Sequence, residues 1–257
     1  MASRSRVVSL SLELTVLLTA VAFVAGYISS IAGSGGLLTL PILLSTGLPV
    51  IHALATNKVQ SALGTLSSTW NFFRKGHLRH RELVLSVVLA SIGSALGTMV
   101  VQRLGNELLL HLIPLLLIVI ALYFIFSPRI SDAASTARLS ARQFAWLVAL
   151  PMGFYGGFFG PGMGSVFPFL FVWLCGYSLP SATAQTKLMV LTINSTSALL
   201  FITAGQVLWD LAMLMAAAQM LGARLGSNAV MQGGSAFVQP IIIAVTLAMA
   251  IKLLVWP

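Results

Sequence analysis

The chain consists largely of apolar stretches that are long enough to cross a lipid bilayer, joined by short polar connectors. A transmembrane helix needs about 20 predominantly apolar residues, and eight stretches approach that length. They are Val7–Ile28, Ile51–Phe73, Leu83–Gln102, Leu108–Phe126, Arg142–Phe159, Ala182–Ile202, Leu208–Val230 and Phe237–Trp256. Only 7% of the residues are charged, whereas soluble domains carry about 25%. Because the stretches are continuous rather than alternating, the sequence predicts an all-α polytopic membrane protein with about eight transmembrane helices, not a β-barrel.

Two further apolar segments are too short to cross a bilayer comfortably, and each follows a glycine-rich turn. Leu37–Ser45 comes after Gly33–Gly36, and Ser165–Cys175 comes after Gly160–Gly164. Unwound backbone at membrane depth is tolerated only where it is buried in protein or lines a wet cavity. We therefore expect two re-entrant segments with helix N-termini inside the membrane, where free N–H groups bind anions.

The turn glycines have two interpretations. In the first interpretation their backbone N–H groups bind the anion, and the candidates are Gly35, Gly36, Gly162 and Gly164. As packing residues, they would only let helices approach closely, which is the interpretation we favour for the GxxxG pairs Gly93/Gly97 and Gly222/Gly226.

Two lysines lie within the membrane-length stretches, Lys58 in ATNKVQSALG and Lys187 in AQTKLMVLT. A lysine at the centre of a bilayer costs about 2.5–3.5 kcal/mol on insertion scales, so it normally faces the protein interior. Neither stretch offers an acidic partner, and buried positive charges without carboxylates favour an anion from outside the chain. The alternative is that both side chains extend to the membrane interface.

Polar side chains accompany both lysines. Asn57, Ser61 and Thr65 recur at spacings of four residues, so they share one helix face. Thr186 and Asn194 occupy the matching face of the second lysine helix. Each of these residues alone is more often structural, since Ser and Thr in membrane helices commonly satisfy their own backbone. Beside a lysine in both stretches, they predict the lining of a binding cavity.

The two halves of the chain repeat one another. Gly33 aligns with Gly160 at an offset of 127 residues, and after a two-residue insertion Lys58 aligns with Lys187 at an offset of 129. The sequence therefore predicts two four-helix membrane repeats, residues 1–127 and 142–257, joined by a polar linker over residues 128–141.

The basic residues predict the orientation in the membrane. The net charge is +9, but the Lys and Arg residues lie in short connectors, which excludes a nucleic-acid surface and favours the positive-inside rule. The 74–81 loop, the linker and the N-terminus are all basic. All three face the cytoplasm only if the short segments are re-entrant, which makes the two repeats parallel. The sequence therefore predicts a multi-pass protein of the bacterial cytoplasmic membrane with both termini on the cytoplasmic side.

The sequence shows no pattern typical of a disulfide, a metal site or a catalytic site. The single Cys175 excludes an internal disulfide, and the four histidines form no metal-ligand pattern. No GxxxxGK[ST] phosphate loop, paired carboxylates or Ser/His/Asp set is present, so we expect neither an enzyme nor a cofactor.

Three segments carry a family resemblance: GYISSIAGSGGLLTLPILLSTGLP, ATNKVQSALGTLSS and TKLMVLTINSTSALLF. They resemble the sulfite exporter TauE/SafE family of permeases, and the TNK and TK motifs are most similar to its YfcA-type branch. The resemblance covers nearly the whole chain. It implies a four-plus-four helix transporter for sulfite, sulfoacetate or related sulfur-containing anions.

The expected function is therefore secondary transport of a small anion by alternating access within the lipid membrane. The alternative is an anion-selective channel in which the lysines set selectivity. A coupling proton and a homo-oligomeric state both remain open.

Overall fold

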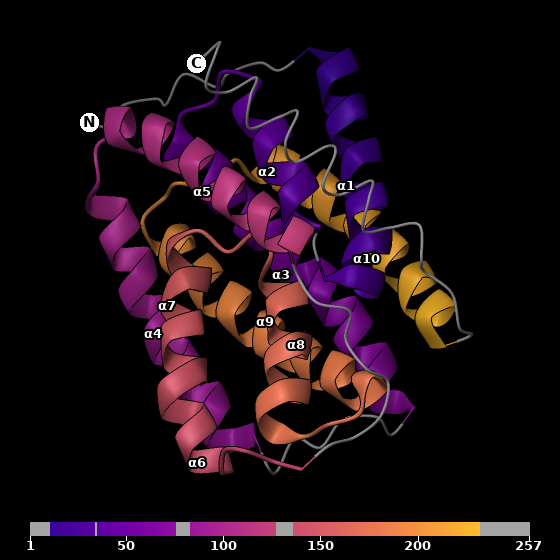
Figure 1. The fold of residues 1–257 in the computed structure, drawn as a ribbon. Coiled ribbons are helices and arrows are strands. Elements are labelled where there is room, and N and C mark those ends of the chain that lie inside the picture. The colour runs from indigo at the N-terminus through magenta and orange to yellow at the C-terminus, as the bar shows by residue number, and fades with distance from the viewer. Residues whose placement is uncertain (1–10, 34, 76–82, 127–135, 232–257) are drawn as a thin grey trace.

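The computed structural model describes residues 11–33, 35–75, 83–126 and 136–231 (Figure 1). These parts of the chain are helical and contain no strand, which confirms the predicted all-α class. The helices are α1 (Leu12–Ala32), α2 (Gly36–Leu44), α3 (Val50–Arg74), α4 (Val84–Arg103), α5 (Asn106–Phe126), α6 (Ala141–Phe144), α7 (Leu150–Phe158), α8 (Met163–Cys175), α9 (Leu179–Thr203) and α10 (Trp209–Met231). A short π-helical stretch, η2 (Ala145–Ala149), joins α6 to α7. The last predicted span, Phe237–Trp256, lies outside the described residues.

Three of the described helices are long and apolar enough to cross a membrane. The apolar stretches are Leu12–Ile31 in α1, Val84–Arg103 in α4 and Ser181–Thr203 in α9. Large apolar side chains remain exposed along the outside of the bundle, among them Leu12, Trp70 and Leu221. Exposed apolar surface on this scale suits contact with lipid.

Local sequence determines where several helices begin and end. Ser11 caps α1 by accepting a hydrogen bond from the backbone N–H of Leu14. Ser140 and Gln143 form a reciprocal capping box at the start of α6. Helix α1 ends at Gly33 with φ 72°, and α8 begins after Gly162 with φ 89°. Both glycines adopt left-handed backbone conformations that other residues avoid.

Helices α2 and α8 are the predicted short segments that follow the glycine turns. They contain 9 and 13 residues, so at 1.5 Å per residue they extend only about 14 and 20 Å, less than the roughly 30 Å of a bilayer core. The chain is therefore broken at both turns, and each short helix starts inside the molecule.

Hydrogen bonds establish the directions of the central helices. Ser94 and Thr98 of α4 bond in register with Ile193 and Ser197 of α9, so these two helices run parallel. In contrast, Thr69 near the end of α3 bonds the carbonyl oxygen of Lys187, near the start of α9. Helices α3 and α9 therefore run antiparallel.

The remaining long helices extend this pattern. Ser67 and Asn71 of α3 bond Met220 and Ser227 of α10, so α3 and α10 run parallel. Helix α1 also runs parallel to α10, because Gly222 packs on Phe23 while Gly226 packs on Tyr27. Since α1 and α3 share one direction, α2 must carry the chain back between them. The predicted return of the short segment is thus present, but α1 and α2 together form the hairpin.

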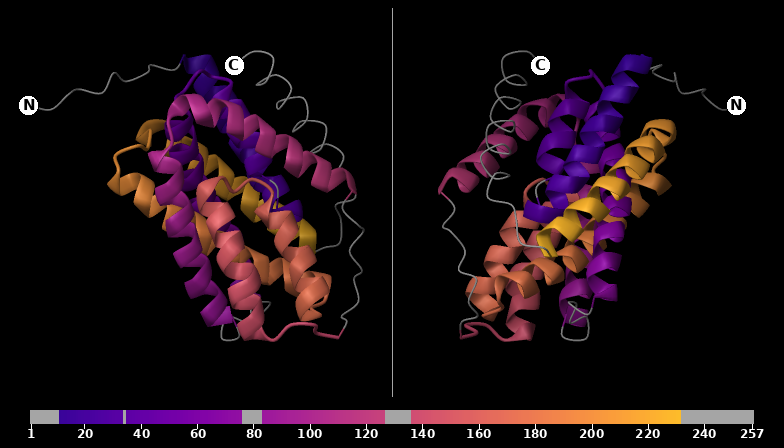
Figure 2. Two further views of the ribbon diagram at one scale, coloured as in Figure 1. Left: turned by 60° about the vertical axis from the view of Figure 1, so that its left-hand side comes forward. Right: turned by 90° about the vertical axis from the view of Figure 1, so that its right-hand side faces the viewer.

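The predicted parallel relation between the two halves is wrong. Parallel repeats would give matching helices a common direction, whereas the matching helices α3 and α9 run antiparallel. Figure 2 shows the same opposition: α1 begins at the upper end of the molecule and α6 at the lower end. The prediction failed because it placed the reversal within the short segment alone, whereas α1 and α2 together form the hairpin and leave α1 and α3 in one direction.

The GxxxG pairs lie where long helices from different halves cross. A Cβ atom added at Gly93 or Gly97 in α4 would overlap backbone atoms of α7. Gly222 and Gly226 in α10 have the same relation to α1. The packing interpretation of these four glycines is confirmed, and the close approach joins the first half of the chain to the second.

Candidate functional site

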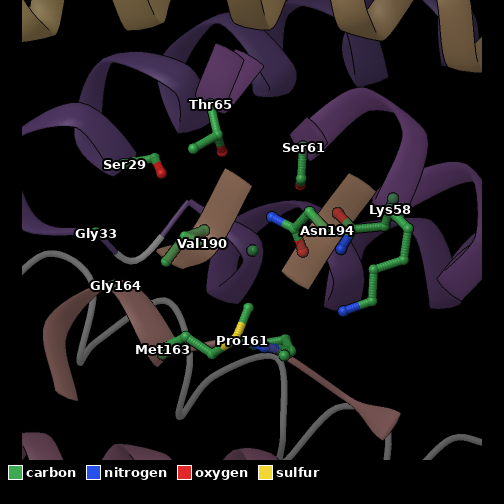
Figure 3. Close-up of a pocket in the computed structure, with 14 residues that line it drawn as sticks. Ser29, Gly33, Lys58, Ser61, Thr65, Pro161, Met163, Gly164, Val190 and Asn194 are labelled. Atoms are coloured by element: carbon green, nitrogen blue, oxygen red, sulfur yellow. The ribbon is translucent and has the colours of Figure 1, made fainter. Parts of the chain in front are cut away.

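A small cavity lies between the two glycine turns and the two lysine helices (Figure 3). Its volume is about 30 Å³, enough for one or two water molecules. The lining residues are Ser29, Gly33, Gly36, Asn57, Lys58, Ser61, Thr65, Gly160, Pro161, Gly162, Met163, Gly164, Val190 and Asn194. These residues come from α1, α2, α3, α8, α9 and both turns, so the cavity depends on segments far apart in the sequence.

Eight of the eleven predicted site residues line this cavity. They are Lys58, Asn57, Ser61, Thr65, Asn194, Gly36, Gly162 and Gly164. The three that do not are Lys187, Thr186 and Gly35. The Thr186 hydroxyl donates to the carbonyl of Ala182 in its own helix, 2.8 Å away. A Cβ atom at Gly35 would overlap the Ala25 carbonyl oxygen and the Ser29 side chain, so this glycine permits close packing against α1.

Lys58 is the one ionisable side chain of the cavity lining. Its side chain is 1% exposed, and its ammonium donates a hydrogen bond to the carbonyl oxygen of Gly156, near the end of α7. A cation is favourable there because the C-terminal end of a helix carries partial negative charge. An ammonium has three donors, so two remain after the bond to Gly156.

Lys187 makes the equivalent contact on the other half of the molecule. Its ammonium donates to the carbonyl oxygen of Ser29 at 2.5 Å, and the N–H of Gly33 donates to the same oxygen at 2.8 Å. Each lysine therefore stabilises the end of the broken helix in the opposite half. Neither reaches the membrane interface, because both side chains are at least 96% buried.

Three buried polar side chains of the lining make no hydrogen bond with any other described residue. They belong to Ser61, Thr65 and Asn194, each less than 9% exposed. Figure 3 shows Asn194 between Lys58 and Val190, with Ser61 and Thr65 above it. Their shared orientation toward one cavity indicates a ligand site.

Asn57 is held so that its NH₂ group remains for a ligand. Its side-chain oxygen accepts from the Thr39 hydroxyl at 2.6 Å and from the Gln60 amide at 2.9 Å. With the oxygen doubly engaged, the group that Asn57 offers to the cavity is a donor. Together with the lysine ammonium, the hydroxyls and the Asn194 amide, this gives a donor-rich lining without a carboxylate.

The two glycine turns touch beside the cavity. A Cβ atom at Gly33 would overlap the backbone of Gly164, and one at Gly164 would overlap the backbone of Gly33. Gly160 and Gly162 have φ of 101° and 89°, so the second turn needs glycine for its conformation as well. The N-termini of α2 and α8 thereby meet at the cavity, where their dipoles favour negative charge.

Six lining residues were absent from the predicted set: Ser29, Gly33, Gly160, Pro161, Met163 and Val190. Gly33 and Gly160 belong to the predicted turns, and the alignment of the two halves marks them. Ser29 has no such signal, because one serine in an apolar helix is ordinary. Met163 and Val190 are apolar and are indistinguishable in sequence from core residues.

The arrangement suits an anion rather than a metal cation. Among the residues that the structure describes, no group of three or more His, Cys, Asp or Glu side chains comes together. A lining with one ammonium and several N–H and O–H donors matches the acceptor oxygens of a small oxyanion. The fold and site thus define a helical membrane protein with a buried, donor-rich cavity between two broken helices.

Comparison with known proteins identifies the family. The sequence model described as "Sulfite exporter TauE/SafE" matches residues 18–253, and the chain belongs to this family. It is 40% identical over 244 residues to a "Probable membrane transporter protein" of Haemophilus influenzae, covering 95% of this chain and 96% of the relative. It is also 40% identical over 234 residues to the "Probable membrane transporter protein YfcA" of Escherichia coli K12, covering 91% and 87%.

A third relative agrees with this membership. The "Probable membrane transporter protein ORF9" of a Sinorhizobium species is 37% identical over 248 residues, covering 96% of this chain and 95% of the relative. No solved structure shows a significant match. The resemblance seen in the glycine and lysine segments is confirmed, and the protein is a helical membrane protein of a transporter family.

Proposed function

We propose that the protein is a secondary transporter that moves a small sulfur oxyanion, such as sulfite or an organosulfonate, across the membrane by alternating access. One observation carries the proposal: Lys58 shares a cavity with three buried polar side chains that make no hydrogen bond to any other described residue. The family description supports sulfite as the first anion to test.

Each group of the site has a distinct task in this mechanism. Lys58 neutralises the anion while retaining its bond to the end of α7. The Asn57 and Asn194 amides and the Ser61 and Thr65 hydroxyls donate to its oxygens. Because the cavity holds only one or two waters, an oxyanion enters by displacing them.

We further propose that the chain consists of two repeats of opposite orientation, residues 1–127 and 142–257, joined by the linker 128–141. The reciprocal packing of α1 on α10 and of α4 on α7 supports this relation. Transporters with inverted repeats bind substrate near the midplane, at helices broken in both halves. In this arrangement α1 and α2 form the hairpin of the first repeat, and α7 and α8 form that of the second.

The basic connectors assign the membrane sides. The 74–81 loop and the linker region hold more Lys and Arg than the N-terminus, so the end where α3 finishes and α6 begins faces the cytoplasm of a bacterial inner membrane. The N-terminal end of α1 then lies on the external side. An impermeant thiol reagent should label cysteines placed at Lys75 and Thr136 only from the cytoplasm and one at Ser11 only from outside. Labelling of Ser11 from the cytoplasm contradicts the assignment.

Transport by purified protein in liposomes tests the function. Sulfite, sulfoacetate and methanesulfonate are offered with and without a pH gradient, and counterflow is measured with unlabelled anion inside. A carrier accelerates uptake when anion is present on the opposite side, whereas an anion-selective channel shows no such acceleration. Lys58→Met should abolish uptake, and the exposed Lys75→Met serves as the charge-matched control. Absence of flux for every anion would refute the transport proposal.

A further inference from the structure

Lys58 and Lys187 occupy mirrored positions but have unequal access to the cavity. Each is the ninth residue of a 25-residue helix, counted from Val50 and from Leu179. Lys58 bonds Gly156, four residues before Gly160, and Lys187 bonds Ser29, four residues before Gly33. Nevertheless, only Lys58 lines the cavity.

The rest of the cavity is nearly balanced between the two halves. Four pairs of matching positions line it from both sides: Gly33 with Gly160, Gly36 with Met163, Ser61 with Val190, and Thr65 with Asn194. At three other pairs of matching positions only one residue lines the cavity: Lys58 but not Lys187, Asn57 but not Thr186, and Ser29 but not Gly156. Some neighbouring turn residues are also unmatched. The cavity is thus displaced from the centre of the molecule toward Lys58.

The two lysines also enter the site from opposite ends of the molecule. Thr69 lies beside the backbone of Lys187 and eleven residues beyond Lys58, which corresponds to about 16 Å along α3. Because α3 and α9 run antiparallel, Lys58 lies nearer the end where α3 begins. Lys187 lies nearer the end where α9 begins.

From this geometry we propose that the two lysines hold the transported anion in turn, each serving one face of the membrane. In the described state both lysines anchor a helix end, Lys58 that of α7 and Lys187 that of α1, but only Lys58 also lines the cavity. In the state of opposite access the turns exchange their arrangement, so that Lys187 also faces the anion and Lys58 only anchors the end of α7. This division of labour rests on the proposed transport function and on the opposed orientation of the halves.

A lysine beside a helix end can have two roles, as an anchor of that end and as a contact for the anion. As an anchor, the lysine supplies one N–H to a carbonyl, a contact that a neutral amide donor retains. As an anion contact, it supplies charge, which a neutral donor lacks. Lys→Gln therefore keeps the anchor role in part and removes the charge, while Lys→Met removes both.

Transport from each face separately tests the proposal. Methanesulfonate, which stays a monoanion at neutral pH, is used in proteoliposomes of known orientation. We expect Lys58→Gln to raise the KM roughly tenfold or more at the face where α3 begins, as for loss of one charge-assisted hydrogen bond, with little change at the other face. Lys187→Gln should show the reverse pattern. Lys58→Met and Lys187→Met should repeat both patterns if they remain folded, and Lys75→Met should change neither face.

Three results would overturn the division between the lysines. They are equal KM changes at both faces for either Gln variant, no change at either face for Lys187→Gln, and a change at the same face for both. A melting temperature for each variant shows whether a change in flux reflects unfolding; if a Gln variant unfolds, the corresponding Arg variant, which keeps the charge, must preserve the KM at both faces. Failure of the wild-type protein to move any anion is a separate result that refutes transport itself.

Discussion

The two lysine helices, α3 and α9, carry similar motifs but present them differently to the cavity. In the first half, Lys58 lines the cavity and its partner residues Asn57, Ser61 and Thr65 do so as well. In the second half, Asn194 lines the cavity, whereas Lys187 bonds Ser29 outside the lining. Similar sequence in two places therefore does not imply equal function in one state. The difference shows that a buried lysine here has two available roles, anion contact and helix anchor.

The largest effect should come from the point where the two halves touch. Gly33→Ala or Gly164→Ala would place a Cβ atom on the backbone of the facing turn, which cannot move like a flexible side chain. We expect a loss of about 3 kcal/mol or more in stability, measured as a fall in melting temperature in detergent. Gly47→Ala shares the left-handed strain of Gly33→Ala, with φ 78°, but has open space around it, so the difference between these two variants isolates the steric part. Equal losses for Gly47→Ala and Gly33→Ala would show that contact between the turns adds nothing.

The next largest effect is the difference in anion affinity between variants of the two lysines. In equilibrium binding of methanesulfonate to the purified protein, Lys58→Gln should lower affinity roughly 10- to 150-fold, because a hydrogen bond to a charged group contributes about 1.5–3 kcal/mol. Lys187→Gln should lower affinity less, since Lys187 does not line the cavity in the described state. Isothermal titration on both variants compares them. A larger loss at Lys187 than at Lys58 would contradict the asymmetry.

A smaller effect is expected for the uncharged donors. Asn194→Leu removes an amide that faces the cavity without a protein partner, and affinity should fall about fivefold to tenfold. Thr186→Val is the matched control, because its hydroxyl bonds Ala182 in its own helix. Both variants are compared by titration and by melting temperature. If Thr186→Val lowers affinity as much as Asn194→Leu, the cavity lining does not identify the ligands.

The smallest effect concerns a hydrogen bond that tethers the second turn. The Tyr155 hydroxyl donates to the carbonyl oxygen of Pro161, whereas Ile28 stands at the matching position of the first half and has no donor. Tyr155→Phe should cost about 1 kcal/mol of stability and lower affinity only a fewfold, since the cavity lining stays in place. Ile28→Leu, at the matching position of the first half, provides the control. A loss of binding as large as that of Lys58→Gln would move Tyr155 into the binding site itself.

The glycines show where local pattern is enough and where it is not. The GxxxG spacing of Gly93 and Gly97 predicted close helix crossing, and the structure confirms it. The turn glycines had two interpretations, and the structure divides them. Gly36 and Gly162 line the cavity, Gly35 packs against α1, and Gly164 does both because it lines the cavity while touching Gly33.

The sequence by itself determined the class of the molecule, the broken helices and most of the candidate site. Hydropathy and the positions of Gly and Pro act over one helix length, so they predict helices and interruptions without any knowledge of packing. The spacing of Asn57, Ser61 and Thr65 likewise depends only on the helical repeat. Eight of eleven predicted residues meet at one cavity for this reason.

Only the tertiary structure decided the direction of the two halves and the separate positions of the lysines. Direction depends on whether the chain reverses within the short segment alone or between α1 and α2, and both paths have the same local hydropathy. Whether Lys187 faces the cavity or the end of α1 depends on Ser29, a residue 158 positions away along the chain. Such contacts arise from the packing of one half on the other, and local sequence carries no information about them.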